Sequence, residues 1–221
     1  MGRLIVIDGL DGSGKETQSE RLLAALEKKK LPVKKVEFPT YGKSSALIEM
    51  YLGGAFGAHA GDVNAYAAST FFAVDRVASY LGDWKAFYEK GGTVLADRYT
   101  TSNAIHQLSK LPQEQWEEFL TWLSEFEFEK LALPRPDLVI FLDMPSEIAD
   151  RLLAVRYAGD ETKKDLHERD RAYQRRCREA ARYCAERLAW RIISCVENGE
   201  LLTREKIAAK VLAEVEKDIE C

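Results

Sequence analysis

Two glycines and a lysine stand at the spacing of a phosphate-binding loop near the start of the chain. In GLDGSGKETQ, the pattern G-x-x-x-x-G-K runs from Gly9 through Gly14 to Lys15. Glycines let consecutive backbone N–H groups point inward around an anion, and the lysine adds a mobile positive charge. Glu16 follows, where a hydroxyl that ligates Mg²⁺ normally stands. The pattern predicts binding of nucleotide phosphates, with the metal held in another way.

Other oxygen donors near this loop can replace the missing hydroxyl. Thr17 offers a hydroxyl one residue later, Asp11 lies within the loop, and Asp97 ends a later apolar run. Mg²⁺ usually takes one or two protein carboxylates and completes its shell with water. We therefore expect a working loop in which Glu16 is tolerated rather than catalytic.

A second group of residues has the chemistry of an acceptor pocket. In ADRYTTSNAIHQ, Arg98 presents a planar guanidinium that suits a phosphate. Phe72 and Arg76 stand four residues apart, which places a ring and a guanidinium on one face of a helix. The segment FPTYG, residues 38–42, adds further rings. These residues predict a pocket for a phosphorylated planar molecule that faces the loop.

Apolar runs that alternate with longer helical patterns must position these groups. The strand candidates are residues 4–8, 33–38, 93–97, 138–143 and 191–196. Nearly continuous apolar strands separated by helices indicate a parallel sheet covered on both faces. Ligands of such sheets bind beyond the carboxyl ends of the strands, where the residues above stand. The sequence predicts an α/β fold, an open doubly wound parallel sheet of about five strands flanked by helices.

The amino-acid composition and charge argue against several classes of function. The 32 basic and 36 acidic residues give a net charge of -4, which argues against a nucleic-acid polymer as partner. No apolar run reaches the length of a membrane span, and the N-terminal apolar segment is too short for a secretion signal. The four cysteines lack C-x-x-C spacing. We expect a cytoplasmic protein with no membrane partner and a single domain over residues 1–221.

A match to the guanine-reading motif of GTPases is a decoy. The segment TKKD, residues 162–165, fits T-K-x-D, but the polar RYAGDE precedes it instead of a buried strand. No D-x-x-G follows a middle strand either. The polar stretch 156–165 instead predicts a mobile loop.

Taken together, the motifs resemble the thymidylate kinase (dTMP kinase) family of P-loop nucleoside monophosphate kinases. GLDGSGKETQ, FPTYG, FFAVDR, DRYTTSNAIHQ and LPRPDLVIFLD occur in the family's order and spacing, over roughly residues 3–196. The resemblance implies transfer of the γ-phosphoryl group of ATP to the 5′-phosphate of dTMP, with Mg²⁺, in a homodimer that serves dTTP synthesis. It also implies a closing lid at about 151–168, ahead of a C-terminal helix at about 203–220.

The resemblance assigns roles to individual residues. The ATP side would comprise Gly9, Leu10, Asp11, Gly12, Ser13, Gly14, Lys15, Glu16, Thr17 and, near the adenine, Arg151. The dTMP side would comprise Asp11, Phe38, Pro39, Tyr41, Phe72, Arg76, Arg98, Ser102, Asn103, His106, Gln107 and His167. The metal would be held by Asp11, Thr17, Asp97 and, through water, Glu168. Catalysis would depend on Lys15, Asp11, Arg98 and a lid cation, for which Arg156 comes before Lys163 and Lys164.

More specifically, Phe72 would stack on thymine, with Arg76 at a base carbonyl and Asn103 beside the base. Tyr41 would lie near the acceptor phosphate. The peptide bond between Phe38 and Pro39 stands where family members can have a cis bond.

Two departures from the family pattern bear on the acceptor. His106 stands where the family usually has Tyr or Phe near the sugar, and His167 replaces a lid aromatic. We expect altered sugar or base tolerance. One alternative is a P-loop kinase for another (deoxy)nucleoside monophosphate. Another is a catalytically silent nucleotide-binding module, for which Glu16 is the sequence support.

Overall fold

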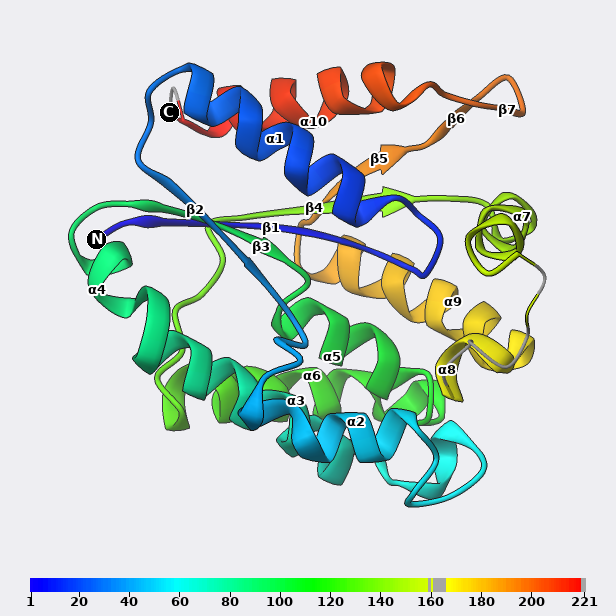
Figure 1. Cartoon of the computed structure of the whole chain (residues 1–221). Coiled ribbons are helices and arrows are strands. Elements are labelled where there is room, and N and C mark those ends of the chain that lie inside the picture. The colour runs from blue at the N-terminus through cyan, green and yellow to red at the C-terminus, as the bar shows by residue number, and fades with distance from the viewer. Residues whose placement is uncertain (159, 161–165, 220–221) are drawn as a thin grey trace.

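A parallel five-stranded sheet forms the centre of the molecule (Figure 1). The computed structural model describes residues 1–158, 160 and 166–219. The strand order is β2 (Val33–Glu37), β3 (Thr93–Asp97), β1 (Arg3–Gly9), β4 (Leu138–Asp143) and β5 (Arg191–Ser194). All neighbouring strands run parallel. The predicted α/β class and doubly wound sheet are confirmed.

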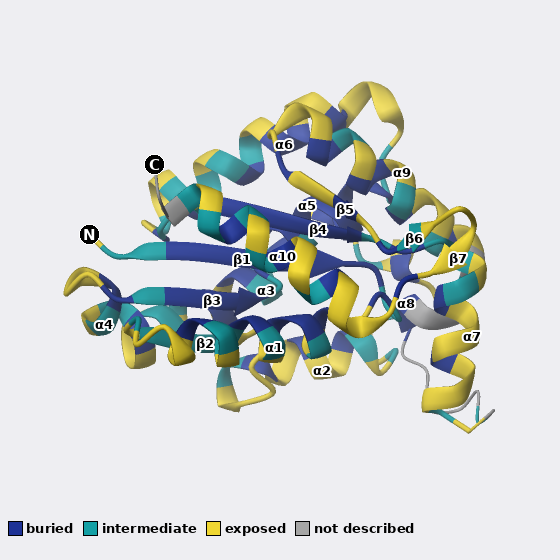
Figure 2. Ribbon diagram, turned by 90° about the horizontal axis from the view of Figure 1, so that it is seen from above, coloured by how far each residue is buried: buried dark blue, intermediate teal, exposed yellow. Residues whose placement is uncertain are grey.

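The sheet is covered on both faces because its strands carry apolar residues on both sides. In β1, Leu4 and Val6 pack into one core cluster, while Ile5 and Ile7 pack into another. Figure 2 shows the central strands β1, β3 and β4 almost continuously buried, whereas the edge strand β5 is largely exposed. The first cluster lies under α3 (Ala65–Ser79), α5 (Thr100–Leu108), α6 (Trp116–Ser124) and α9 (Arg171–Arg187). The second lies under α1 (Lys15–Lys28) and α10 (Arg204–Ile219).

Shorter elements connect these layers. They are the helical turns Lys43–Ser45, Ala60–Asp62, Tyr80–Trp84, Gln113–Gln115 and Glu125–Lys130, and the helices α2 (Ala46–Leu52), α4 (Lys85–Glu89), α7 (Ser146–Arg156) and α8 (Leu166–Arg169). No helix among the described residues combines the length and the apolar character needed to cross a membrane.

The last predicted strand is shorter than expected. β5 ends at Ser194, and a small hairpin follows, in which β6 (Val196–Glu197) pairs antiparallel with β7 (Glu200–Leu201). Asn198 and Gly199 form its turn, with φ of 53° and 81°. An Asn-Gly pair readily adopts positive φ at both positions of a tight hairpin turn, which explains why β6 and β7 pair with each other.

The predicted lid lies only partly within the described residues. The predicted range 151–168 begins inside α7 and ends inside α8. Residues 159 and 161–165 are outside the described set, and with them the TKKD segment, Lys163 and Lys164. The backbone of Glu168 belongs to α8, but its side chain is not described.

Candidate active site

One pocket of about 710 Å³ opens at the carboxyl ends of β1 and β3. Its volume is typical of sites for small ligands. The pocket is lined by Asp11–Gln18 of the loop and α1. All the predicted acceptor residues line it, which besides Asp11 are Phe38, Pro39, Tyr41, Phe72, Arg76, Arg98, Ser102, Asn103, His106, Gln107 and His167. Asp97 and Arg156 line it as well. Asp11 and His167, which are 156 positions apart in the sequence, thus meet around one cavity.

Of the predicted site residues whose side chains the structure describes, three do not line the pocket. Gly9 and Leu10 belong to the base of the loop, where the Gly9 N–H donates to the Asp8 carboxylate at 2.7 Å. The Arg151 side chain donates to the Glu147 carbonyl of its own helix at 3.1 Å. The structure therefore leaves Arg151 outside the cavity wall.

The loop has the backbone conformation that its glycines permit. Gly12 and Gly14 have φ of 77° and 85°, a region that residues with a Cβ rarely adopt. A Cβ on Gly12 would also come within 2.7 Å of the Ala149 carbonyl oxygen of α7. Gly14 precedes α1, whose N-terminus has no side-chain cap. Its first N–H groups therefore remain available to an anion.

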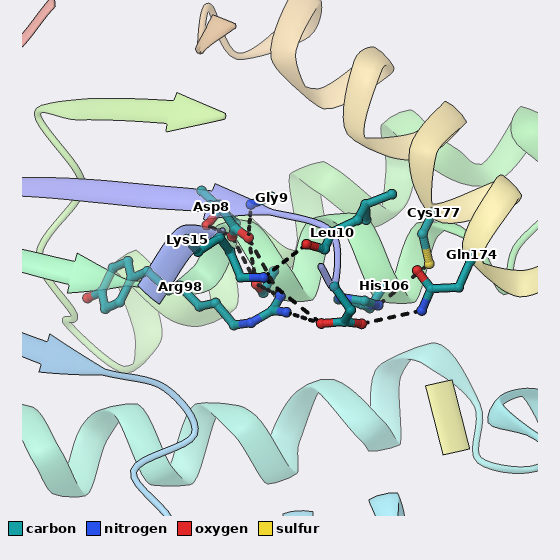
Figure 3. A network of polar contacts seen from close by, with 12 residues as sticks. Asp8, Gly9, Leu10, Lys15, Arg98, His106, Gln174 and Cys177 are labelled. Atoms are coloured by element: carbon teal, nitrogen blue, oxygen red, sulfur yellow. Dashed lines mark hydrogen bonds and ion pairs between the residues drawn. The ribbon is translucent and has the colours of Figure 1, made fainter. Parts of the chain in front are cut away.

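Lys15 lies at the floor of the pocket. Its side chain is buried, and Nζ donates to the Leu10 carbonyl at 3.0 Å and lies 4.0 Å from Oδ1 of Asp11 (Figure 3). Burial lowers the Lys15 pKa, and the nearby Arg98 guanidinium lowers it further. The free protein therefore stabilises the positive charge of Lys15 poorly, and an incoming phosphate would stabilise that charge.

Arg98 is the centre of the charged network (Figure 3). Its guanidinium donates to Asp11 and to Ser102 Oγ, the latter at 3.0 Å, and lies 3.7 Å from Asp8. Burial would lower the Arg98 pKa, but the Asp11 and Asp8 carboxylates outweigh it and raise the pKa. Arg98 and Tyr41 have φ of 63° and 50°, which is uncommon outside glycine. Such strain clusters at functional sites.

Asp11 already has a partner for each carboxylate oxygen. Oδ1 accepts from Arg98, and Oδ2 accepts from Gln174 Nε2 of α9 at 3.3 Å. Burial would raise the Asp11 pKa, but Arg98 and Lys15 hold it well below the usual range. Gln174 was not predicted, because its helix is distant in sequence from the loop and its surroundings carry no motif.

The predicted metal ligands do not form a ready-made cage. Among the described residues, no group of three or more His, Cys, Asp or Glu side chains is placed to hold a metal ion. Asp97 accepts a hydrogen bond from Ser19 Oγ of α1 at 3.0 Å, and Thr17 lines the same pocket. This donor set fits an ion such as Mg²⁺ that arrives with phosphates and keeps several waters.

A buried acid neutralises the predicted base-reading arginine. Arg76 is 2% exposed, and its Nε donates to Oε2 of the fully buried Glu127 at 2.9 Å. Asn103 donates to the other oxygen of Glu127 at 3.0 Å. Glu127 was not predicted, although one sign existed: it stands four residues after the buried Leu123, on a helical face that is otherwise apolar.

The peptide bond between Phe38 and Pro39 is cis, as the resemblance implied. Phe38 is buried, and its ring lies 5.8 Å from the ring of Tyr99.

The two histidines form a stacked pair in the pocket wall. The rings of His106 and His167 lie 5.1 Å apart, tilted by 17°, and both side chains are buried. Nδ1 of His106 is 3.4 Å from the Tyr173 hydroxyl and 3.5 Å from Cys177 Sγ. Burial and the other imidazole lower the pKa of His106, and burial and Lys110 lower that of His167 to about 3. Both rings are therefore neutral at pH 7.

These lowered pKa values predict a loss of stability in acid. The unfolded chain protonates His167 near its ordinary pKa of 6.5, whereas the folded chain does so only near 3. The unfolded state thus binds more protons below pH 6.5, and folding stability falls as pH drops from there toward 3. Between pH 7 and pH 5 this group contributes a loss of about 2 kcal/mol.

Urea unfolding at pH 7 and pH 5 measures this loss. A His167→Phe variant should lose less stability over the same interval. An equal loss in both proteins would contradict the assignment. Asp11 does not confuse the comparison, because its linkage begins only near its ordinary pKa of 3.8.

Glu16 points toward the end of α7 rather than into the phosphate loop. Its Oε2 lies 3.9 Å from Nη2 of Arg156, and both side chains are more than half exposed. Exposed ion pairs contribute little to stability. Replacing Glu16 with alanine should therefore change kcat/KM by less than about tenfold. A thousandfold loss in steady-state assays would show that Glu16 takes part in catalysis.

The comparisons with known proteins agree with this geometry. A family model described as thymidylate kinase matches residues 7–207. The thymidylate kinase of Mycobacterium tuberculosis (strain CDC 1551 / Oshkosh) is 34% identical over 176 residues, 78% of this chain and 81% of that protein. The thymidylate kinase of Caenorhabditis elegans is 32% identical over 160 residues, 67% of this chain and 66% of that protein.

A solved structure supports the fold. The thymidylate kinase from Candida albicans has a TM-score of 0.71 against this chain at 22% identity, with 98% of this chain and 92% of that chain covered. Both the loop and the acceptor motifs fall inside the range that the family model matches. The chain belongs to the thymidylate kinase family.

Proposed function

We propose that this chain transfers the γ-phosphoryl group of ATP to the 5′-phosphate of dTMP, giving ADP and dTDP for dTTP synthesis. The observation that carries the proposal is the convergence of two phosphate-binding cations on one carboxylate. Lys15 and Arg98 both line the pocket, and both lie beside Asp11. A donor phosphate on Lys15 and an acceptor phosphate on Arg98 would be brought together in this way.

On the donor side, the loop glycines and the α1 N-terminus would hold the phosphates through backbone N–H groups. Lys15 would exchange the Leu10 carbonyl for the β- and γ-phosphate oxygens. Arg156, on the pocket wall at the end of α7, would supply positive charge to the transferring group. Arg151 would serve the adenine only after its side chain leaves the Glu147 carbonyl.

On the acceptor side, Arg98 and Tyr41 would hold the phosphate, and Phe72 would stack on thymine. Glu127 holds the Arg76 guanidinium by accepting a hydrogen bond from Nε. The remaining N–H groups of Arg76 would then donate to a base carbonyl. Asn103, held by the same carboxylate, would lie beside the base.

Mg²⁺ would be held by Thr17 and Asp97 together with phosphate oxygens and water. When bound, it supplies neutralisation of phosphate charge. Asp11 would remain engaged by Arg98 and Gln174 and act mainly by orienting the acceptor clamp. Glu168 remains a candidate of the sequence alone, since its side chain lies outside the described part of the chain.

The whole chain would act as one cytoplasmic kinase domain with a lid at about 151–168, and it would form a homodimer. Tyr66, Val74 and Leu81 stand on one face of α3 and the turn after it, and are 37%, 56% and 61% exposed. This apolar face would be covered by a second copy of the chain.

Replacing Val74 with aspartate should therefore convert a dimer to a monomer in sedimentation measurements. A charge buried in a dimer interface opposes association strongly. Leu188→Asp, at an exposed apolar site after α9, is the matched control and should remain dimeric. A wild-type monomer, or an unchanged Val74→Asp dimer, would contradict this face as the interface.

Product analysis tests the proposed reaction. ATP, Mg²⁺ and dTMP should yield ADP and dTDP in equal amounts, while thymidine in place of dTMP should yield neither. Binding of ATP without dTDP formation would instead favour the silent nucleotide-binding module.

A further inference from the structure

His106 and His167, whose stacked rings line the acceptor pocket, are called the histidine wall here. A series of hydrogen-bonded side chains packs against this histidine wall on the side away from the pocket. The Tyr51 hydroxyl of α2 is 2.9 Å from Nε2 of His167 and 2.9 Å from Nζ of Lys110. It also donates to the Ala60 carbonyl at 3.2 Å. Lys110 donates in addition to the Val63 carbonyl at 3.1 Å. One phenol oxygen thus joins α8 to α2 and to the segment after α5.

The Tyr51 ring contributes to the same connection. It is 1% exposed and meets the His167 ring edge to face, at 5.4 Å between centroids. The Lys110 ammonium lies 4.9 Å above the Tyr51 ring, within the range of a cation–π contact. Tyr51 does not line the pocket, whereas His167 and His106 do.

The element that carries His167 cannot hold its position by itself. α8 spans only Leu166–Arg169, and one helical turn has no stability of its own. It packs against α2 and α9, where Gln174 Nε2 donates to the His167 carbonyl at 3.0 Å. Leu166 shares a small apolar cluster with Tyr51. The hydrogen bond between the Tyr51 hydroxyl and Nε2 of the His167 imidazole adds a polar contact to this packing.

The histidine wall lies between the two parts of the acceptor site. On one side, the His106 imidazole is close enough to Asp11 and Arg98 for both charges to act on its pKa. On the other side, Tyr51 joins His167 to the Phe72 ring, which lies 6.3 Å from the Tyr51 ring. A displaced His167 would open the wall between the phosphate clamp and the aromatic surface.

We propose that Tyr51 and Lys110 are positioning residues that hold His167 against His106 and so shape the acceptor side of the pocket. The inference rests on the proposed function, since it takes this wall to enclose the nucleoside monophosphate. Lys110 supports it further, because its ammonium is partly buried, with a pKa lowered to about 7 by burial, and is held there by the Tyr51 hydroxyl and the Val63 carbonyl.

Tyr51→Phe is the sharpest variant, because it removes the hydroxyl and keeps the ring in its packing. The KM for dTMP should rise about tenfold, which corresponds to the loss of one buried hydrogen bond. The KM for ATP and kcat should stay within about twofold, since the donor half of the pocket is untouched. Lys110→Met should give a similar but smaller rise, and Lys110→Arg should restore part of the affinity.

Because the effect of Lys110 on His167 passes through the Tyr51 hydroxyl, the KM of the double variant for dTMP should be no higher than that of Tyr51→Phe alone. Tyr183→Phe and Lys34→Met are matched controls. Each makes the same substitution but loses an exposed hydrogen bond, to Glu117 and to Asp83, at residues that do not line the pocket. Neither control should change the KM for dTMP.

The experiment distinguishes failure of the proposed function from failure of the positioning role. If the wild-type protein does not phosphorylate dTMP, the proposed function fails. If it does, but Tyr51→Phe leaves the KM for dTMP unchanged or raises both KM values equally, the positioning role is overturned. A thermal melt of each variant shows that the comparison is made on folded protein.

Discussion

Replacement of Lys15 by methionine is expected to lower kcat by about a thousandfold or more. Phosphoryl transfer depends on neutralising charge that builds up on the phosphate oxygens, and methionine keeps the length of the lysine without its ammonium. The free energy of unfolding, by contrast, should not fall. Burial and Arg98 lower the Lys15 pKa in the free protein, which means that its charge is poorly stabilised there.

The two predictions for Lys15 separate function from stability. Urea unfolding of Lys15→Met should show stability equal to or above that of the wild type, while steady-state kinetics show the loss of turnover. Lys28→Met, at the exposed end of the same helix, controls for the loss of a charge from α1. A Lys15→Met enzyme within tenfold of wild type would contradict the role of the loop.

Replacement of Arg98 by alanine should damage both the fold and the acceptor site. Its guanidinium lies between the buried Asp8 and the mostly buried Asp11, and removing one partner of a buried ion pair costs about 3–5 kcal/mol. The Asp11 pKa should rise toward its usual range, since Arg98 is the largest influence that lowers it. The kcat/KM for dTMP should fall by about a thousandfold.

Arg98→Lys keeps the charge but loses the planar fork that reaches Asp11 and Ser102 together. It should recover most of the stability and only part of the activity. Arg135→Ala, which breaks an exposed pair with Glu129, is the control and should alter neither property. If Arg98→Ala raised the KM for ATP and left that for dTMP unchanged, Arg98 would belong to the donor side.

The strands and the loop were predictable because their signals are local. Each depends on a short run of neighbouring residues, such as the apolar segment Leu4–Ile7 or the spacing of Gly9, Gly14 and Lys15. The small hairpin after β5 also has a local signal, because the Asn198–Gly199 pair that forms its turn can be recognised in the sequence.

The supporting residues of the site could not be predicted in this way. Glu127 pairs with Arg76 over 51 positions, and Gln174 contacts Asp11 over 163. Tyr51 and His167 meet across 116 positions. Such pairings depend on how the helices pack against the sheet. They cannot be predicted from the periodicity of a single segment.

A coupled assay of ADP release over a panel of nucleoside monophosphates tests the central claim most directly. With ATP and Mg²⁺, the account predicts robust turnover of dTMP and much weaker turnover of dUMP, dCMP and dGMP. The ribose form of TMP belongs in the same panel, because His106 and His167 replace the aromatic residues expected beside the sugar. Turnover of another monophosphate in preference to dTMP, or no turnover of any of them despite ATP binding, would contradict the account.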